Sequence, residues 1–251
     1  MTSLMAFEGV ATATFILMGF VVGLRLLLLA HRTRQLPETA LGCGLFLIVG
    51  IAYPLYLVAI AAPGLSLATA RLLAALSVVC MNPGWLAICV FTWRVFRPDA
   101  GWARIVVACV GVLLGAIVVA RLAELWSMSD RLYLVQNSPA LLSIQATAVA
   151  MYVWTGVEAL LCHRRLRRQL ALGLIEPVVV NRVALWACIA GFGLLTVAPA
   201  CIAGLVGQRM DQIILIRLVS ALAGLAVGGL LYLAFFPPRF YLRHVAGGAT
   251  A

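Results

Sequence analysis

The chain has 251 residues, of which 65% are hydrophobic and only 10% are charged, and its formal net charge is +10. Lysine is absent, so every basic side chain other than histidine is an arginine. This composition excludes an ordinary soluble domain and predicts an all-α, polytopic membrane protein. The positive charge is interpreted as a topology signal, so we expect no nucleic-acid partner.

Seven apolar stretches follow one another, each holding about 20 residues, the length that a helix needs to cross the hydrocarbon core. A helix of a soluble protein needs only one apolar stripe. We therefore predict a single seven-helix membrane domain over residues 1–251, surrounded by the lipid bilayer. The predicted spans are Ala6–Ala30, Ala40–Ala62, Ala70–Phe91, Ile105–Leu125, Pro139–Cys162, Arg182–Val206 and Gln212–Phe236.

Arginines are concentrated after the first, third and fifth spans and in the C-terminal tail. The positive-inside rule predicts an N-terminus outside and a C-terminus in the cytoplasm. Arginine-only usage is typical of a GC-rich bacterial genome, which favours the bacterial cytoplasmic membrane as the location. The densest cluster follows the fifth span and is predicted to contact a cytoplasmic signalling partner or lipid headgroups; its members are Arg164, Arg165, Arg167 and Arg168.

The first three spans resemble the last three, which predicts two parallel repeats, 6–93 and 139–236, joined by a linker helix at 105–125. His31-Arg-Thr-Arg-Gln-Leu is echoed by His163-Arg-Arg-Leu-Arg-Arg-Gln-Leu. Pro54 and Pro199 fall at matching positions. Such a three-plus-one-plus-three plan occurs in transporters. The alternative is that arginine-rich loops and apolar runs look alike in any membrane protein.

Two charged residues lie inside predicted spans at a shared depth, Arg25 in the first and Glu158 in the fifth. A lone charge near mid-bilayer costs roughly 2.5–3.5 kcal/mol on insertion scales, so we expect an Arg25–Glu158 ion pair between the repeats. The alternative is that each side chain snorkels to the interface.

A second candidate site is a cavity near the middle of the membrane, lined by Asn82, Pro83, Gln145 and Trp154. Proline removes a backbone donor and bends the third span, and a polar side chain beside such a bend is typical of a substrate path. The same residues also suit a packing kink with an interhelical hydrogen bond.

A third candidate is an anion site at the outer end, built from Arg71, Arg121 and Arg217. Several converging guanidinium groups favour a carboxylate or phosphate. The alternative interpretation is that these arginines anchor helix ends at the headgroup layer.

No cofactor is expected. A retinal Schiff base requires a lysine, and all three histidines, His31, His163 and His244, fall at the predicted cytoplasmic face, away from any intramembrane haem. No metal-site spacing and no catalytic motif is recognisable, so an enzyme is not the favoured class. Small-residue pairs such as Gly111/Gly115 permit close helix contact and leave a homodimer open.

The run Arg32-Thr-Arg-Gln-Leu-Pro-Glu38, followed by Leu41-Gly and Tyr53-Pro-Leu55, resembles the first loop of uncharacterised bacterial seven-helix integral membrane proteins. The resemblance covers the first two spans and implies a fold without a function. The topology is similar to opsin-like and receptor-like bundles by analogy only, because the functional residues of those families are missing.

Three functions are consistent with these patterns. The first is a receptor-like sensory or regulatory module that binds a small molecule and acts through cytoplasmic loops. The second is a small-solute transporter working between the two repeats. The third is a non-catalytic accessory subunit whose polar residues only hold helices together.

Overall fold

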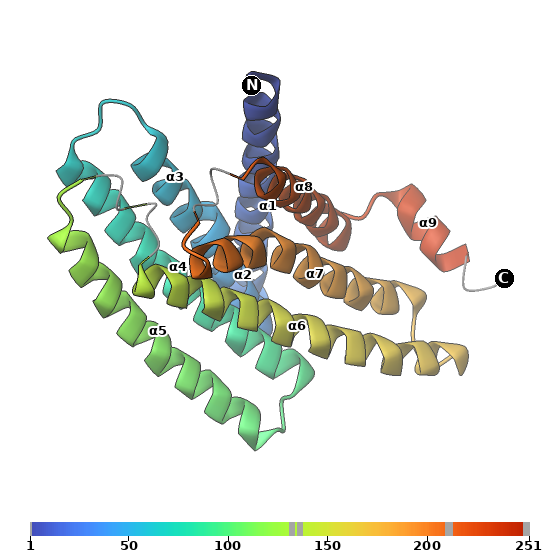
Figure 1. Cartoon of the computed structure of the whole chain (residues 1–251). Coiled ribbons are helices and arrows are strands. Elements are labelled where there is room, and N and C mark those ends of the chain that lie inside the picture. The colour runs from blue at the N-terminus through green and yellow to red at the C-terminus, as the bar shows by residue number, and fades with distance from the viewer. Residues whose placement is uncertain (1, 131–133, 135–137, 209–212, 248–251) are drawn as a thin grey trace.

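The computed structural model describes residues 2–130, 134, 138–208 and 213–247, and Figure 1 shows it as a bundle of long helices. No strand occurs among these residues. Seven helical segments are long and apolar enough to cross a membrane, as the sequence predicts. The chain is therefore a multi-pass helical membrane protein. The segments are α1 (Thr2–Thr33), α2–η1–α3 (Leu36–Leu45, Phe46–Ala52, Tyr53–Ala61), α4 (Leu67–Phe96), α5 (Gly101–Ser127), α6 (Pro139–Ala171), α7 (Pro177–Leu205) and α8 (Ile214–Phe235).

The second span changes its winding along its length. A π-helical segment, η1, lies between α2 and α3 and ends at Ala52, two residues before Pro54. Proline has no N–H to donate, so one hydrogen bond of the helical ladder is missing at this position. The backbone N–H of Tyr53 instead bonds the carbonyl of Ile48, one residue further back than in an α-helix. The second span thus changes its helix type just before Pro54.

Glycines allow α1 and the second span to cross closely. A Cβ atom added at Gly23 would lie 2.8 Å from the backbone nitrogen of Phe46, a distance that no side-chain movement can relieve. Gly84 of α4 is similarly tight, because its Cβ would lie 2.5 Å from the side chain of Ile48. Small residues at such crossings let helix backbones approach, which substitutes for a hydrophobic driving force inside lipid.

The helix ends gather in two groups. At one end, called here the arginine-rich end, α1, α4, α6 and α8 finish and α2, α5 and α7 begin. Contacts between Arg25 of α1 and Phe235 of α8 join helices at this end. At the opposite end, Tyr56 of α3 donates to the carbonyl of Leu134, and Glu8 of α1 pairs with Arg217 of α8. Which end faces the cytoplasm stays a prediction.

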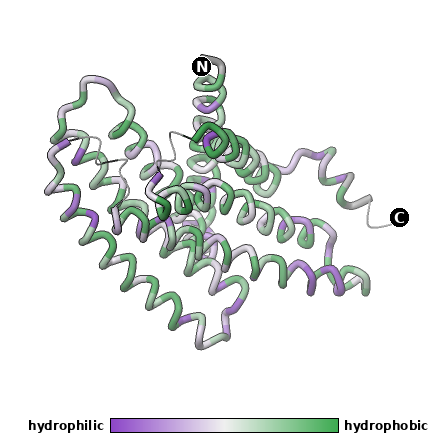
Figure 2. The backbone as a smooth tube through the Cα atoms, viewed as in Figure 1, coloured by the Kyte–Doolittle hydropathy of each residue, from purple (hydrophilic) through white to green (hydrophobic). Residues whose placement is uncertain are grey.

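The helices are mostly hydrophobic along their length, and hydrophilic residues collect near their ends, as Figure 2 shows. Helix α5 lies at the edge of the bundle in Figure 1, where it packs on α4 and α6. Its outward side chains are large and apolar and include Ile105, Val112, Val119 and Trp126. A helix that is apolar on its outer face suits lipid rather than water as its solvent.

Helix α6 is longer than predicted. The predicted fifth span ends at Cys162, but α6 continues to Ala171 and carries 33 residues, about 50 Å of helix at 1.5 Å per residue. A hydrocarbon core is about 30 Å thick, so a basic extension of α6 projects past it. A short further helix, α9 (Arg239–Gly247), follows α8 and lies apart from the bundle core in Figure 1.

Candidate functional site

Arg25 does not form the expected ion pair with Glu158. Its Nη1 donates to the carbonyl of Phe235 at 2.7 Å, and its guanidinium lies 4.3 Å from the ring centroid of Phe236. Phe235 is the last residue of α8, where backbone carbonyls lack helical partners and the helix dipole is negative. Arg25 therefore caps α8 from α1.

Glu158 is paired with Arg97 instead. Its carboxylate accepts from the Nε of Arg97 at 2.9 Å, and Glu158 is only 6% exposed. One turn further into the membrane, the hydroxyls of Thr92 and Thr155 lie 2.8 Å apart. These contacts form a polar seam between α4 and α6.

The prediction was wrong because depth alone does not identify neighbours. Helix α1 packs on α2 and α8, whereas α6 packs on α7 and α4. Sequence reasoning missed Arg97 as the partner, since it lies past the predicted end of the third span. Its position at the end of α4 was the available signal, because an arginine can reach back from a helix end toward a buried carboxylate.

A cavity of about 340 Å³ lies at the arginine-rich end, between α1, α2, α4, α7 and α8. Its apolar wall includes Phe91, Trp186 and Phe235, whose rings contact one another with centroid separations of 5.4 Å (Phe91–Trp186) and 5.9 Å (Trp186–Phe235). Leu26, Leu29, Pro37, Leu41 and Ala234 complete the apolar lining. A volume of this size falls within the range of small-molecule sites.

Three charged side chains also line this cavity: Arg25, Arg182 and Glu38. Arg182 is exposed on the first turns of α7. Glu38 lies near the start of α2, where its carboxylate accepts a hydrogen bond from the hydroxyl of Thr33. Two guanidinium groups against one carboxylate leave the lining with a positive balance, beside an aromatic wall. This combination of groups suits a molecule with an anionic head and an apolar body.

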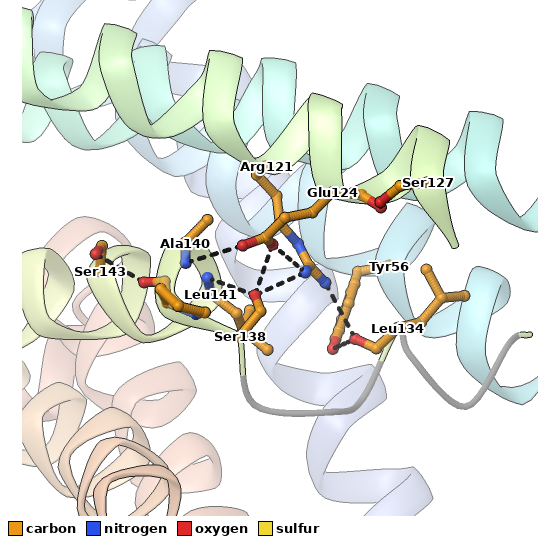
Figure 3. A network of polar contacts seen from close by, with 10 residues as sticks. Tyr56, Arg121, Glu124, Ser127, Leu134, Ser138, Ala140, Leu141 and Ser143 are labelled. Carbon is orange, nitrogen blue, oxygen red and sulfur yellow. Dashed lines mark hydrogen bonds and ion pairs between the residues drawn. The ribbon is translucent and has the colours of Figure 1, made fainter. Parts of the chain in front are cut away.

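The three arginines of the predicted outer anion site do not share one site. Arg121 is 2% exposed, and its Nη1 donates to Glu124 at 2.8 Å and to the hydroxyl of Ser138 at 2.9 Å, as Figure 3 shows. Arg71 donates to the carbonyl of Met128, and Arg217 pairs with Glu8 across α1 and α8. Inside a membrane protein each guanidinium is stabilised by partners close at hand, and here those partners lie on different helices.

The Arg121 network ties the end of α5 to the start of α6. Ser138 is the N-cap of α6, where its hydroxyl accepts from the N–H of Leu141 and donates to Glu124 at 2.6 Å. Leu134 in the connection accepts from both Arg121 and Tyr56, so α3 joins the same network in Figure 3. The hydrogen bonds described here all join groups of the protein itself, which is typical of a structural clamp.

The predicted midplane residues are placed on two neighbouring helices, α4 and α6. Helix α4 continues through Pro83 without a break, and Asn82 donates from Nδ2 to the carbonyl of Val78 at 2.8 Å. The buried atoms Asn82 Oδ1 and Gln145 Oε1 have no hydrogen-bond partner among the described residues. The same holds for the indole N–H groups of Trp85 and Trp154.

The Thr92–Thr155 contact joins residues 63 positions apart, which places Asn82 near the level of Gln145 if the two helices keep that register. Buried polar groups are normally satisfied, so the unpaired ones on these two helices favour a bound water or polar solute. Whether a cavity opens there stays a prediction.

The four arginines of the α6 extension, Arg164, Arg165, Arg167 and Arg168, are all exposed. Figure 2 shows hydrophilic residues along this part of α6. His163 of the same segment contacts the carbonyl of Val180 at 3.3 Å, which helps to fasten the extension to α7. The extension is thus held by α7 while its charges remain open to contact.

In the part of the chain that the structure describes, no three His, Cys, Asp or Glu side chains gather as metal ligands would.

Comparison with known proteins yields no match, because no family model fits the chain and neither a curated protein nor a solved structure resembles it. The functional interpretation therefore depends on the geometry described above.

Proposed function

We propose that this membrane protein is a receptor-like module that binds a small amphipathic anion in the cavity at its arginine-rich end. The observation that carries the proposal is the lining of that cavity, which combines an aromatic wall with two guanidinium groups, Arg25 and Arg182. An apolar body of the ligand would pack on Trp186 and its neighbours, while its carboxylate or phosphate would bind the arginines.

The position of the cavity supports a signalling role. It touches the beginning of α7, and α7 packs along the basic extension of α6. A ligand that draws Arg182 toward the cavity would shift the first turns of α7 and, with them, the exposed arginines of α6. Under the predicted topology this end lies in the cytoplasm, where the four arginines would contact a signalling partner.

Ligand binding can be tested with the purified protein in detergent or nanodiscs. We expect decanoate to raise the midpoint of thermal unfolding, because a ligand that binds only the folded state stabilises it. Decanol is the matched control, since it has the same chain without the charge. The Arg182→Gln variant should bind decanoate about tenfold more weakly, as expected for loss of a charge-assisted bond. An equal response to decanol, or an unchanged response in the variant, would remove the anion-binding proposal.

The signalling step needs its own readout. Hydrogen exchange over 161–171 should change on addition of decanoate in the wild type and remain unchanged in Arg182→Gln. Crosslinking through Arg164–Arg168 should then recover a partner, and neutralising these arginines should abolish that recovery. Binding without any change in the α6 extension would leave a ligand-binding protein that does not signal by this route.

A transporter is the second candidate, and the unpaired buried atoms of Asn82, Trp85, Gln145 and Trp154 favour it. Polar groups without partners near mid-membrane are typical of a path that a hydrated solute enters. Proteoliposomes that contain only this protein would then show solute flux, and Asn82→Ala with Gln145→Ala would reduce it. If neither flux nor ligand binding occurs, the accessory-subunit interpretation is the one that remains.

A further inference from the structure

The short helix α9 stands directly beyond the end of the last span. Helix α8 ends at Phe235, and Pro237 and Pro238 separate it from α9, which begins at Arg239. Two successive prolines cannot continue an α-helix, so the chain must change direction at this point. Since α8 is a membrane span, α9 starts within a few residues of the headgroup layer.

One side of α9 is fastened to the bundle. The hydroxyl of Tyr241 accepts a hydrogen bond from Nδ2 of Asn181 on α7 at 2.8 Å, and Tyr241 and Leu242 are half-buried. The other side is open. It presents the exposed arginines Arg239 and Arg243 and the ring of Phe240, which is 73% exposed.

An exposed phenylalanine between two arginines has a clear physical preference at this location. Guanidinium groups bind phosphate oxygens in paired geometry, and an aromatic ring enters the boundary between headgroups and acyl chains. Each basic residue held near an anionic surface adds attraction, and α8 already keeps the helix at that surface. Free association with a membrane would be weak for so short a helix, but a tethered helix avoids most of that cost.

We propose that α9 is an interfacial helix that binds anionic phospholipid headgroups through Arg239 and Arg243, with Phe240 inserted between the lipids. Tyr241 and Asn181 hold the helix in the orientation that directs these three side chains outward. The proposal does not depend on the cavity or on its ligand.

Hydrogen exchange of the full-length protein in two kinds of nanodisc tests this assignment. In phosphatidylcholine mixed with phosphatidylglycerol, amides 239–247 should exchange roughly 25-fold more slowly than in phosphatidylcholine alone, about fivefold for each arginine. Raising the ionic strength should reduce this difference, because salt screens the attraction.

Two variants keep the test specific. Arg239→Gln with Arg243→Gln should abolish the lipid dependence, and Phe240→Ser should raise exchange in both kinds of disc. Arg32→Gln with Arg34→Gln removes the same charge from the same end of the bundle and should leave α9 unchanged. Equal exchange in both lipids would overturn the proposal and leave the open side of α9 to a protein. Lipid dependence that persists in the double arginine variant would overturn it as well.

Discussion

Arginines at the two ends of this bundle have opposite surroundings. At one end Arg121 is buried, and its guanidinium is bonded to Glu124, Ser138 and the carbonyl of Leu134. At the other end Arg25 donates to the backbone carbonyl of Phe235 and lies beside a cavity, and the exposed Arg182 lines the same cavity. Arginine side chains are thus enclosed by the protein at one end of the bundle and accessible to a ligand at the other.

This difference shows how a membrane protein uses its few charges. A guanidinium in a low-dielectric interior must be compensated by nearby partners, so a fully bonded arginine contributes to the fold. An arginine at the headgroup level is solvated by water, and it can therefore exchange partners at little cost. The two ends predict different consequences of mutation.

The largest effect is expected at the enclosed arginine. Arg121→Gln leaves Glu124 without its charged partner and removes a donor to Leu134, so we expect the free energy of unfolding to fall by about 3–5 kcal/mol. Thermal unfolding in detergent measures this loss. Arg164→Gln, at an exposed position, is the control. Similar unfolding midpoints for the two variants would mean that the Arg121 network is not a clamp.

A smaller loss is expected at the seam between α4 and α6. Glu158→Gln removes the charge that Arg97 binds, and we expect the free energy of unfolding to fall by about 2 kcal/mol. Exchanging the charges in Arg97→Glu/Glu158→Arg should recover much of the stability. The exchange Arg25→Glu/Glu158→Arg should recover none, because Arg25 binds α8. Rescue by the second exchange would restore the original ion-pair prediction and contradict the structure.

The crossing of α1 and η1 gives the third prediction. Gly23→Ala places a methyl group against the backbone of Phe46 and should cost about 1–2 kcal/mol by forcing α1 away from η1. Gly115→Ala is the matched control, because nothing lies within 4 Å of its added Cβ. Thermal unfolding in detergent should give a lower midpoint for Gly23→Ala than for Gly115→Ala. A loss at Gly115 as large as that at Gly23 would argue for a hidden contact on α5.

The smallest effect on stability is expected at Arg182. Its side chain is exposed, so Arg182→Gln should change the free energy of unfolding by less than about 0.5 kcal/mol. The effect of the substitution should appear only when decanoate is present, as an affinity for decanoate about tenfold weaker than that of the wild type. A large loss of stability without ligand would place Arg182 with Arg121 among the structural arginines and would erase the contrast between the two ends.

Some features were predictable from local sequence alone. The seven spans follow from apolar runs of membrane-crossing length, because hydrocarbon demands an apolar surface all around each helix. Gly19 and Gly23 of α1 form a recognisable small-residue pair, but the pattern does not identify the helix that packs against it. The continuation of α6 past Cys162 was not predicted, because its arginines ended the apolar run without ending the helix.

The sequence pattern did not predict which residues of different helices contact each other. Arg25 and Glu158 share a depth, yet the folded chain places Phe235 beside one and Arg97 beside the other. The sequence did not mark Trp186 as a cavity residue, since a tryptophan near the end of a span is common in any membrane protein.

By itself, the sequence determined that this protein is a set of seven membrane helices, because each span interacts with lipid independently of the others. Only the tertiary structure decided which charges meet, since partners such as Arg97 and Glu158 are 61 residues apart and their contact depends on how whole helices pack. The same packing created the cavity beside Arg25 and Arg182. Solvent preference is a property of each segment, whereas a binding site is a property of their arrangement.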